Sequence, residues 1–161
     1  MREILTQEKL KTLLHYEPET GEFTWLVAKG SRAEAGDVAG YRTKEGYIYI
    51  GVDGRLYGAH RLAFLYMTGS WPEHQVDHKD RDPGDNRWSR IRPSTNGQNN
   101  CNKPTRNKLG VKGVYPSGEK FQVQFKENGQ MKCFGTFETL AEAKAVSLQQ
   151  QTRIHGEFQC F

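Results

Sequence analysis

The chain has 161 residues, of which 35% are hydrophobic and 17 are glycine, and its formal net charge is +4 at pH 7. This composition predicts small modules joined by polar segments rather than one large core, and no apolar run approaches the roughly 20 residues that a membrane helix needs. The cysteines are far apart with no CxxC pair, and the start MREILTQEKL has no apolar signal segment, which argues against a zinc ribbon, a disulfide framework and secretion and favours a cytoplasmic protein.

Residues 1–58 are predicted to form a helix and β-hairpin region. A helix over residues 6–15 begins at the capping residue Thr6, and the following YEPETGEFTW is a turn, with Pro18 and Gly21, that leads into a strand. The alternating segment GYIYIGVDGRLYG predicts two strands joined at Asp53-Gly54, a two-residue turn sequence.

Residues 59–103 are predicted to contain a helix followed by a ββα unit. HRLAFLYMTG has helical apolar spacing and a stop signal at Gly69. The next segment, VDHKDRDPGDNRWSRIRP, predicts two short strands around a Pro-Gly loop, with Val76 and Ile91 directed inward. A helix over residues 95–101 would place Asn99 on its inner side.

The last third of the chain, 111–161, is predicted to be a separate module that follows a basic linker over 104–110. FQVQFK alternates apolar and polar residues, Asn128-Gly129 is a turn sequence, and Thr139 with Glu142 predicts a capping box. This pattern predicts a three-stranded antiparallel sheet packed on one helix, and the whole chain is assigned to the α+β class. The packing side of that helix is assigned to Ala141, Ala145, Val146 and Leu148.

An adjacent carboxylate and imidazole, Asp77 and His78, open the Pro-Gly segment, and the carboxamide Asn99 follows about twenty residues later. Carboxylate and amide oxygens suit a hard divalent cation, Mg²⁺ or Mn²⁺, and an imidazole suits a general base. Because successive strand residues point to opposite sides, His78 would face a water nucleophile on the side away from Asp77. The grouping indicates metal-assisted phosphodiester hydrolysis, with a turn carboxylate beside a surface histidine as the simpler alternative.

Positive charge is concentrated after the Asp-His pair. No acidic residue occurs between Asp85 and Glu119, and that interval contains Arg87, Arg90, Arg92, Lys103, Arg106, Lys108 and Lys112. Such a block is typical of a surface that binds the phosphate backbone, and also of a solvated face or a flexible linker. Arg61 and Arg92 are each interpreted either as phosphate contacts or as partners of acids within the module.

The stretch VDHKDRDPGDNRWSRIR with TNGQNN resembles the HNH (ββα-metal) endonucleases, in particular the phage and intron-encoded homing branch that lacks zinc-knuckle cysteines. In that branch an Asp-His pair opens the motif, and an Asn about twenty residues later takes the place of the last His. The resemblance extends upstream over HRLAF and WPEHQVDH. It implies a metal ion held by Asp77 and Asn99, with His78 as the general base.

One position departs from that family. Its central Asn, which ties the two strands together through bonds to the backbone, usually lies in an NLR-like triplet, whereas this chain has RIR with Arg90 at that place. Arg has no hydrogen-bond acceptor. Loop support is therefore assigned to Asn86, four residues earlier, together with Arg90, and an altered or inactivated nuclease remains an alternative.

The stretches VKGVY, EKFQVQFK, CFGTFETLAEAKAV and IHGEF resemble the plant ethylene-response-factor (apetala-type) DNA-binding domain, which also occurs appended to phage HNH enzymes. The resemblance implies that the polar side of the sheet lies in the major groove with the helix behind it. Plant members are richer in Arg and have Trp where Cys133 stands, so their target sequence is not transferred. Candidate contacts are Lys112, Tyr115, Lys120, Gln124, Lys126 and Cys133, and Gln122 joins them because it shares their side of the sheet.

Together these features predict a metal-dependent DNA endonuclease that binds double-stranded DNA as a monomer and nicks one strand per binding event. No membrane and no obligate protein partner are expected, and His60 is interpreted as a structural histidine. The alternatives are a DNA-binding regulator with a decayed nuclease unit, and a nuclease directed at RNA or at a particular nucleic-acid structure.

Overall fold

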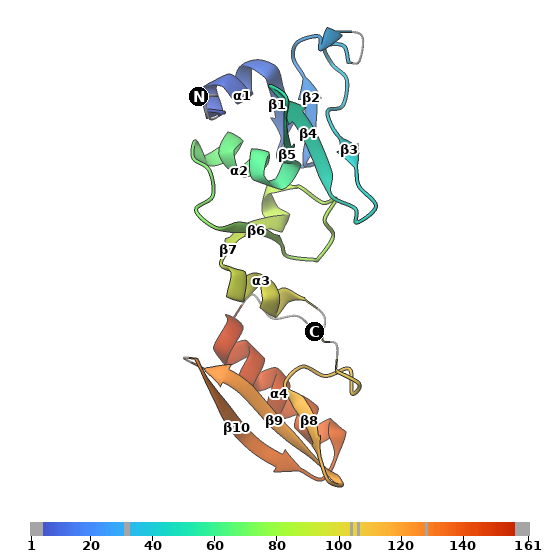
Figure 1. Ribbon diagram of the computed structural model, residues 1–161, viewed down its shortest axis with the longest axis vertical. Helices are drawn as coiled ribbons and strands as arrows, with labels where there is room; N and C mark the ends of the chain where they lie inside the picture. Colours follow the sequence, from blue (N-terminus) through green and yellow to red (C-terminus); the bar gives the residue numbers. More distant parts are fainter. Residues whose placement is uncertain (1–4, 31–32, 104, 106, 128, 157–161) are drawn as a thin grey trace. The chain divides into compact units, whose positions relative to one another are not determined.

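The computed structural model describes residues 5–30, 33–103, 105, 107–127 and 129–156, with the side chains of all of these except residues 101 and 155. They form short helices and small antiparallel sheets, so the predicted α+β class is confirmed (Figure 1). The chain divides into two compact units, residues 1–96 and 97–161. The finer division, with boundaries at 58, 103 and 110, stays a prediction. Within the described ranges, no helix has the length and apolar character that crossing a membrane requires.

The first unit begins with a short helix and a β-hairpin. α1 (Gln7–Leu13) is capped by the side chain of Thr6, as predicted. The helix ends earlier than predicted because Leu14 already belongs to a hairpin of two paired strands, β1 (Leu14–Glu17) and β2 (Glu22–Trp25). The sequence did not predict β1, since its alternation of buried and exposed residues extends over only four positions.

A three-stranded antiparallel sheet follows, in the order β3 (Tyr41–Arg42), β4 (Ile48–Val52) and β5 (Arg55–Gly58). The predicted turn at Asp53-Gly54 joins β4 to β5. Both turn residues have positive φ, 51° and 74°, which is the backbone conformation of a type I′ hairpin turn. The hairpin prediction is therefore confirmed.

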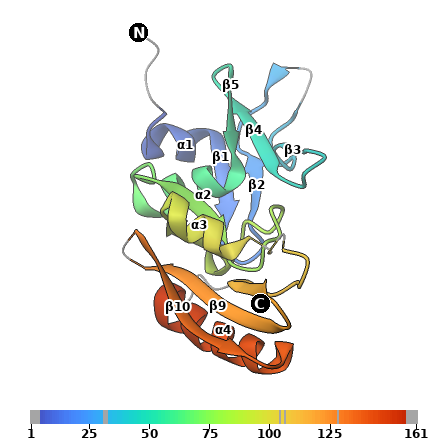
Figure 2. The ribbon, with the colours of Figure 1, turned by 60° about the horizontal axis from the view of Figure 1, so that its bottom comes forward.

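Helix α2 (Ala59–Thr68) supplies much of the core of the first unit. It ends at Gly69, whose φ of 80° lies in the left-handed region, as the sequence predicts. Figure 2 shows α1 and α2 next to each other beside the β1–β2 hairpin. The fully buried side chains of this core include Leu10, Leu14, Tyr16, Ile50, Val52, Leu62 and Leu65.

The predicted ββα unit begins with a hairpin of β6 (Gln75–His78) and β7 (Ile91–Ser94), which pair in antiparallel fashion. Val76 and Ile91 are buried in the core, as predicted. The loop over residues 79–90 joins the two strands and ends in a single turn of 3-10 helix. Helix α3 (Asn96–Asn102) follows β7.

The second unit contains a three-stranded antiparallel sheet with α4 (Leu140–His155) against one side (Figures 1 and 2). The predicted capping box of Thr139 and Glu142 is present at the start of α4. Asn128 of the predicted turn lies outside the described residues, and Gly129 beside it has a φ of 84°. The strands are β8 (Val114–Ser117), β9 (Lys120–Glu127) and β10 (Gln130–Phe137).

The packing side of α4 differs from the prediction. Ala141, Ala145 and Leu148 are exposed, and Val146 alone of the predicted four is half-buried. The buried stripe instead contains two polar residues, which obscured the apolar periodicity in the sequence. It consists of the buried Ala143, Ser147 and Gln151, and the half-buried Leu140, Val146 and Ile154 pack beside them.

Candidate functional site

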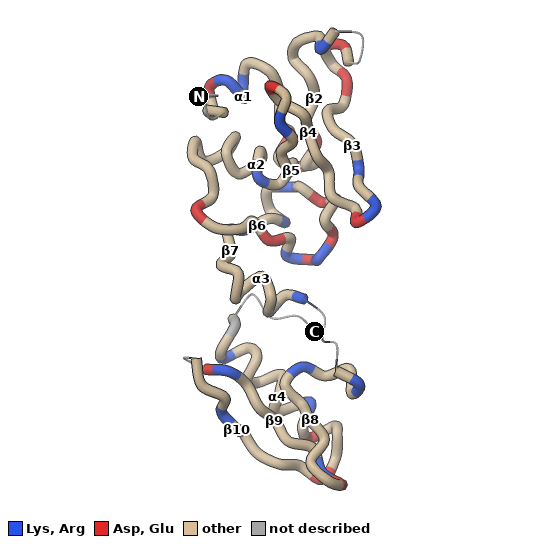
Figure 3. The backbone as a smooth tube through the Cα atoms, in the orientation of Figure 1, with Lys and Arg blue, Asp and Glu red and all other residues tan. Residues whose placement is uncertain are grey.

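The loop between β6 and β7 is rich in charges of both signs (Figure 3). Arg87 donates Nε–H and Nη2–H to the two carboxylate oxygens of Asp85, at 2.7 and 2.5 Å. Arg90 donates Nη1–H to Asp80 Oδ2 at 2.9 Å, and both of these side chains are exposed. Two arginines of the basic block therefore pair with acids of the loop, and Arg90 contacts the loop from its solvent side.

Asp77 lies directly opposite Arg92 in the β6–β7 hairpin. Arg92 donates Nη2–H and Nε–H to Asp77 Oδ2, at 2.9 and 3.1 Å. Only 5% of Asp77 and 7% of Arg92 are exposed. The guanidinium compensates the buried carboxylate and holds it in a defined orientation. Of the two interpretations of Arg92, the structure shows the pairing within its own module.

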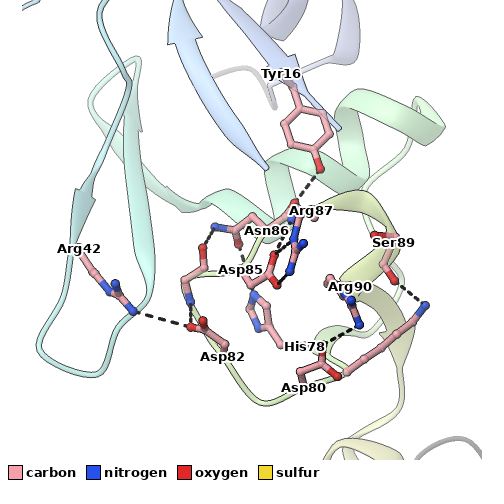
Figure 4. Close-up of polar contacts among 12 residues, drawn as sticks. Tyr16, Arg42, His78, Asp80, Asp82, Asp85, Asn86, Arg87, Ser89 and Arg90 are labelled. Atoms are coloured by element: carbon pink, nitrogen blue, oxygen red, sulfur yellow. Dashed lines mark hydrogen bonds and ion pairs between the residues drawn. The ribbon is translucent and has the colours of Figure 1, made fainter. Parts of the chain in front are cut away.

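His78, the last residue of β6, is buried and faces Asn86 of the loop (Figure 4). His78 Nε2 lies 3.3 Å from Asn86 Oδ1, while Asn86 Nδ2 donates to Gly84 O at 3.1 Å. Because the amide nitrogen is directed at Gly84, the amide oxygen faces the imidazole. An amide oxygen can only accept a hydrogen bond, so the ring nitrogen that faces it must be the donor. Nε2 therefore carries the proton of the neutral ring, and Nδ1 carries the basic lone pair.

The electrostatic surroundings keep the His78 imidazole neutral near pH 7. Burial lowers its pKa below the ordinary value of 6.5. The contact with Asn86 and the nearby carboxylates, Asp77 first among them, act in the opposite direction and only partly offset the effect of burial. A neutral imidazole can accept a proton, which a general base requires.

Two further rings, of His60 and Tyr47, pack against His78. The His60 ring lies edge-on at 5.1 Å between centroids, and the Tyr47 ring lies 6.0 Å from His78. Burial, reinforced by His78 and Arg61, lowers the pKa of His60 to about 4. Among the described residues, His60 Nδ1 has no hydrogen-bond partner. His60 is thus a neutral ring against the candidate base, a contact that its interpretation as structural did not include.

The buried His60 predicts a loss of stability in acid. Its folded-state pKa of about 4 lies below the ordinary 6.5, so between these values the unfolded chain binds a proton that the folded chain does not. The contribution of the neutral His60 ring to the free energy of unfolding is fully present above pH 6.5. It is lost as the pH falls to 4, and the loss amounts to about 3 kcal/mol. Urea unfolding from pH 7 to pH 4 should show this decrease, and His60→Gln should flatten it. The exposed His74→Gln is the control, and its stability should depend on pH as that of the wild type does. If His60→Gln also kept the pH dependence of the wild type, His60 would not be the group responsible for it.

The donor groups proposed for a metal ion lie on separate elements. Asp77 is on β6, and the half-buried Asn99 is on α3, in the second unit. The described residues contain no group of three or more His, Cys, Asp or Glu side chains that could hold a metal ion. Joint coordination by Asp77 and Asn99 therefore stays a prediction.

Arg61, the basic candidate on α2, is held within the first unit. Arg61 donates Nη1–H to His74 O at 3.2 Å, and its guanidinium lies 5.8 Å from the centroid of the Trp71 ring. Like the arginines of the β6–β7 hairpin, it has partners inside its own unit. DNA contact by any of these arginines stays a prediction.

The basic candidates near the start of the second unit differ in exposure. Lys103 is exposed and donates to Asn100 Oδ1 at 2.9 Å, and Lys108 is exposed as well. Lys112 is half-buried, and its backbone oxygen accepts a hydrogen bond from Ser147. Arg106 lies outside the described residues.

The candidate DNA-contacting residues of the β8–β9–β10 sheet in the second unit lie together on the polar side of that sheet. Tyr115 is in register with Gln122, and Gln124 with Cys133. Gln124 Nε2 donates to Gln122 Oε1 at 2.5 Å, and Gln122 Nε2 lies 3.2 Å from Cys133 Sγ. The lysines on the same side of β9 are Lys120 and Lys126, both exposed.

The N-terminal hairpin also contributes to the site, which no motif in the sequence indicates. Tyr16 donates its hydroxyl hydrogen to the backbone oxygen of Asn86 at 2.7 Å (Figure 4). The two residues are 70 positions apart. No pattern within a local sequence window reports a contact at that separation.

Comparison with known families singles out the same part of the chain. Residues 57–101 match the family model described as HNH endonuclease, and this region includes α2, the β6–β7 hairpin and most of α3. No curated protein and no solved structure matches the chain. The match supports the HNH resemblance and implies a nuclease with DNA as its substrate. The apetala-type resemblance of the second unit stays a prediction.

Proposed function

We propose that the HNH region makes this chain a metal-dependent DNA endonuclease of the homing type, which acts in the cytoplasm as a monomer and nicks duplex DNA. One observation carries the proposal: the family match over residues 57–101 includes a hairpin in which His78 is buried, oriented by Asn86 and adjacent to the carboxylate Asp77. A single catalytic unit has one base, so one strand is cut per binding event.

His78 is the general base in this proposal. Its Nδ1 accepts a proton from the water that attacks phosphorus, while Asn86 holds the ring through Nε2. Proton transfer by a positioned side chain contributes typically about 10²–10⁴-fold to the rate. The lowered pKa of His78 keeps Nδ1 available near pH 7.

Asp77 and Asn99 are the proposed metal-binding residues. Both offer oxygen, which suits a hard cation such as Mg²⁺ or Mn²⁺. A carboxylate has about four lone-pair sites, so Asp77 can serve Arg92 and a cation together. When bound, such an ion supplies charge neutralisation at the scissile phosphate and at the leaving 3′ oxygen.

The second unit is proposed to select the DNA site as an apetala-type module. Its sheet presents two carboxamides next to each other, flanked by exposed lysines on the same side. Gln can form two hydrogen bonds with an adenine edge, and Lys binds phosphate. Tyr115 and Cys133 complete this polar side of the sheet.

Substitutions on this polar side should have two distinct effects. Gln124→Ala is expected to lower affinity for the preferred site by about 1–3 kcal/mol with little change on other DNA, because a base contact is lost. Lys126→Ala is expected to weaken binding to all sequences similarly and to reduce the salt slope by about 1. Binding titrations at several salt concentrations measure both quantities. Equal losses on all DNA for both variants would place Gln124 outside base recognition.

A plasmid-nicking assay tests the proposed function directly. The full chain is incubated with supercoiled plasmid and Mg²⁺, Mn²⁺ or EDTA, and nicked circles are expected only with metal. Intact DNA binding without cleavage in any lane would favour the alternative of a regulator with a decayed nuclease unit, to which Arg90 in place of the family Asn points. Faster cleavage of RNA than of duplex DNA would overturn the substrate assignment.

A further inference from the structure

The loop that orients His78 is attached to the N-terminal β1–β2 hairpin. The Tyr16 hydroxyl, in a side chain only 1% exposed, donates to the backbone oxygen of Asn86 at 2.7 Å. The backbone N–H of Trp88 donates to Pro18 O at 3.0 Å. Hydrogen bonds from this hairpin therefore reach the loop both at Asn86 and two residues after it.

Gly21 allows the hairpin turn to approach the loop this closely. Its φ is 77°, a conformation that favours glycine. A Cβ at this position would lie 2.5 Å from the carbonyl carbon of Asn86 and closer still to the amide nitrogen of Arg87. Any larger residue would force the hairpin and the loop apart.

Asn86 connects this contact to the candidate base. Only 2% of Asn86 is exposed, and three of its polar groups have partners. The backbone oxygen accepts from Tyr16, the side-chain nitrogen donates to Gly84, and the side-chain oxygen faces His78 Nε2. A shift of the Asn86 backbone would therefore move the group that orients the imidazole.

Tyr16 is a rigid and permanent donor. Its ring packs against Phe23 and Tyr66, with centroids 4.7 and 5.7 Å away. Burial raises the pKa of the Tyr16 hydroxyl, so the hydroxyl remains protonated and can donate at any working pH. Without this hydroxyl the buried Asn86 oxygen would lose its partner, and the loop would have to rearrange to recover one.

We propose that Tyr16 is a positioning residue that acts through Asn86 on His78, so that the catalytic unit includes the N-terminal hairpin as well as the HNH region. The inference rests on the proposed function, because the orientation of His78 affects cleavage only if His78 is the base. Tyr16 and Gly21 both lie outside residues 57–101, so the matched region alone lacks this support.

The first test is a double-mutant cycle in the full chain. Tyr16→Phe removes one hydroxyl and should lower kcat for nicking about ten-fold with KM within two-fold, since displacements of about 1 Å can cost up to 10²-fold. If Tyr16 acts through Asn86, Tyr16→Phe/Asn86→Ala should be no slower than Asn86→Ala. Tyr66→Phe is the matched control, because it removes a hydroxyl from the same cluster and leaves the Tyr16–Asn86 bond in place. Rates are compared at a temperature at which all variants are folded.

Gly21→Ala is the second variant, and it should lower kcat at least as far as Tyr16→Phe. An unchanged kcat in Tyr16→Phe, or fully additive losses in the cycle, would overturn the inference. A separate readout without metal or DNA is the ¹⁵N NMR spectrum of His78, which should show the Nε2–H tautomer in the wild type and a mixed population in Asn86→Ala and Tyr16→Phe. A wild type that cleaves nothing would contradict the proposed function, and an unchanged tautomer in Tyr16→Phe would still overturn the positioning role.

Discussion

Replacement of His78 by alanine is expected to reduce nicking by about 10²–10⁴-fold, the range typical of a lost general base. The expected loss lies in the chemical step, because His78 is buried behind the loop and presents little surface to DNA. Single-turnover cleavage with Mg²⁺ measures the rate, and a fluorescence titration measures DNA affinity, which should change by no more than a few-fold. Full activity in the variant with metal present would remove His78 from the mechanism.

His74→Ala is the matched control for that experiment. His74 lies four residues earlier, before β6, and its side chain is exposed. Its backbone oxygen accepts from Arg61, a bond that side-chain truncation leaves in place. Equal losses in His74→Ala and His78→Ala would indicate a general effect of histidine removal rather than a specific base.

Replacement of Asp77 by alanine is expected to have two separate effects. Cleavage supported by metal should be lost, because the only carboxylate among the proposed ligands is removed. The free energy of unfolding should also fall by about 3–5 kcal/mol, since Arg92 is left buried without its carboxylate. Chemical denaturation and a metal titration of the nicking rate measure the two effects. Unchanged metal dependence in the variant would refute the assignment of Asp77 as a ligand.

Two companion variants separate these effects. Asp77→Ala/Arg92→Met removes both charges, so most of the lost stability should return while cleavage remains absent. Asn99→Ala should weaken metal-supported cleavage with a smaller effect on stability, because Asn99 is only half-buried. If the double variant were as active as the wild type, Asp77 would have only a structural role.

The basic block illustrates how far charge patterns alone can be interpreted. Its first three arginines are distributed among three acids, Asp85, Asp80 and Asp77, which precede the block in the sequence. Because the block contains only positive charges, its sequence alone suggests that these arginines form a continuous phosphate-binding surface. Their strand and loop positions place each beside a carboxylate instead, so the lysines that follow are the stronger candidates for the predicted contact with phosphate.

Features encoded within a few neighbouring residues were predictable from the sequence. These include the cap at Thr6, the Asp53-Gly54 turn, the end of α2 at Gly69 and the capping box of α4. Each depends on the conformational preference of one or two residues and on hydrogen bonds within a single turn. The HNH motif was recognisable for the same reason, since its residues lie within one short segment of the chain.

Other features were decided only when the chain folded. The Asp77–Arg92 pair, the His60 ring against His78, and the bond from Tyr16 to Asn86 join residues 15 or more positions apart. Local preferences do not specify such contacts, because they depend on strand register and on which sides of the elements are buried together. The residues of the site can therefore be nominated from the sequence, but which group orients the imidazole and which cation neutralises the carboxylate follow from the packing of the N-terminal hairpin, α2 and the β6–β7 hairpin.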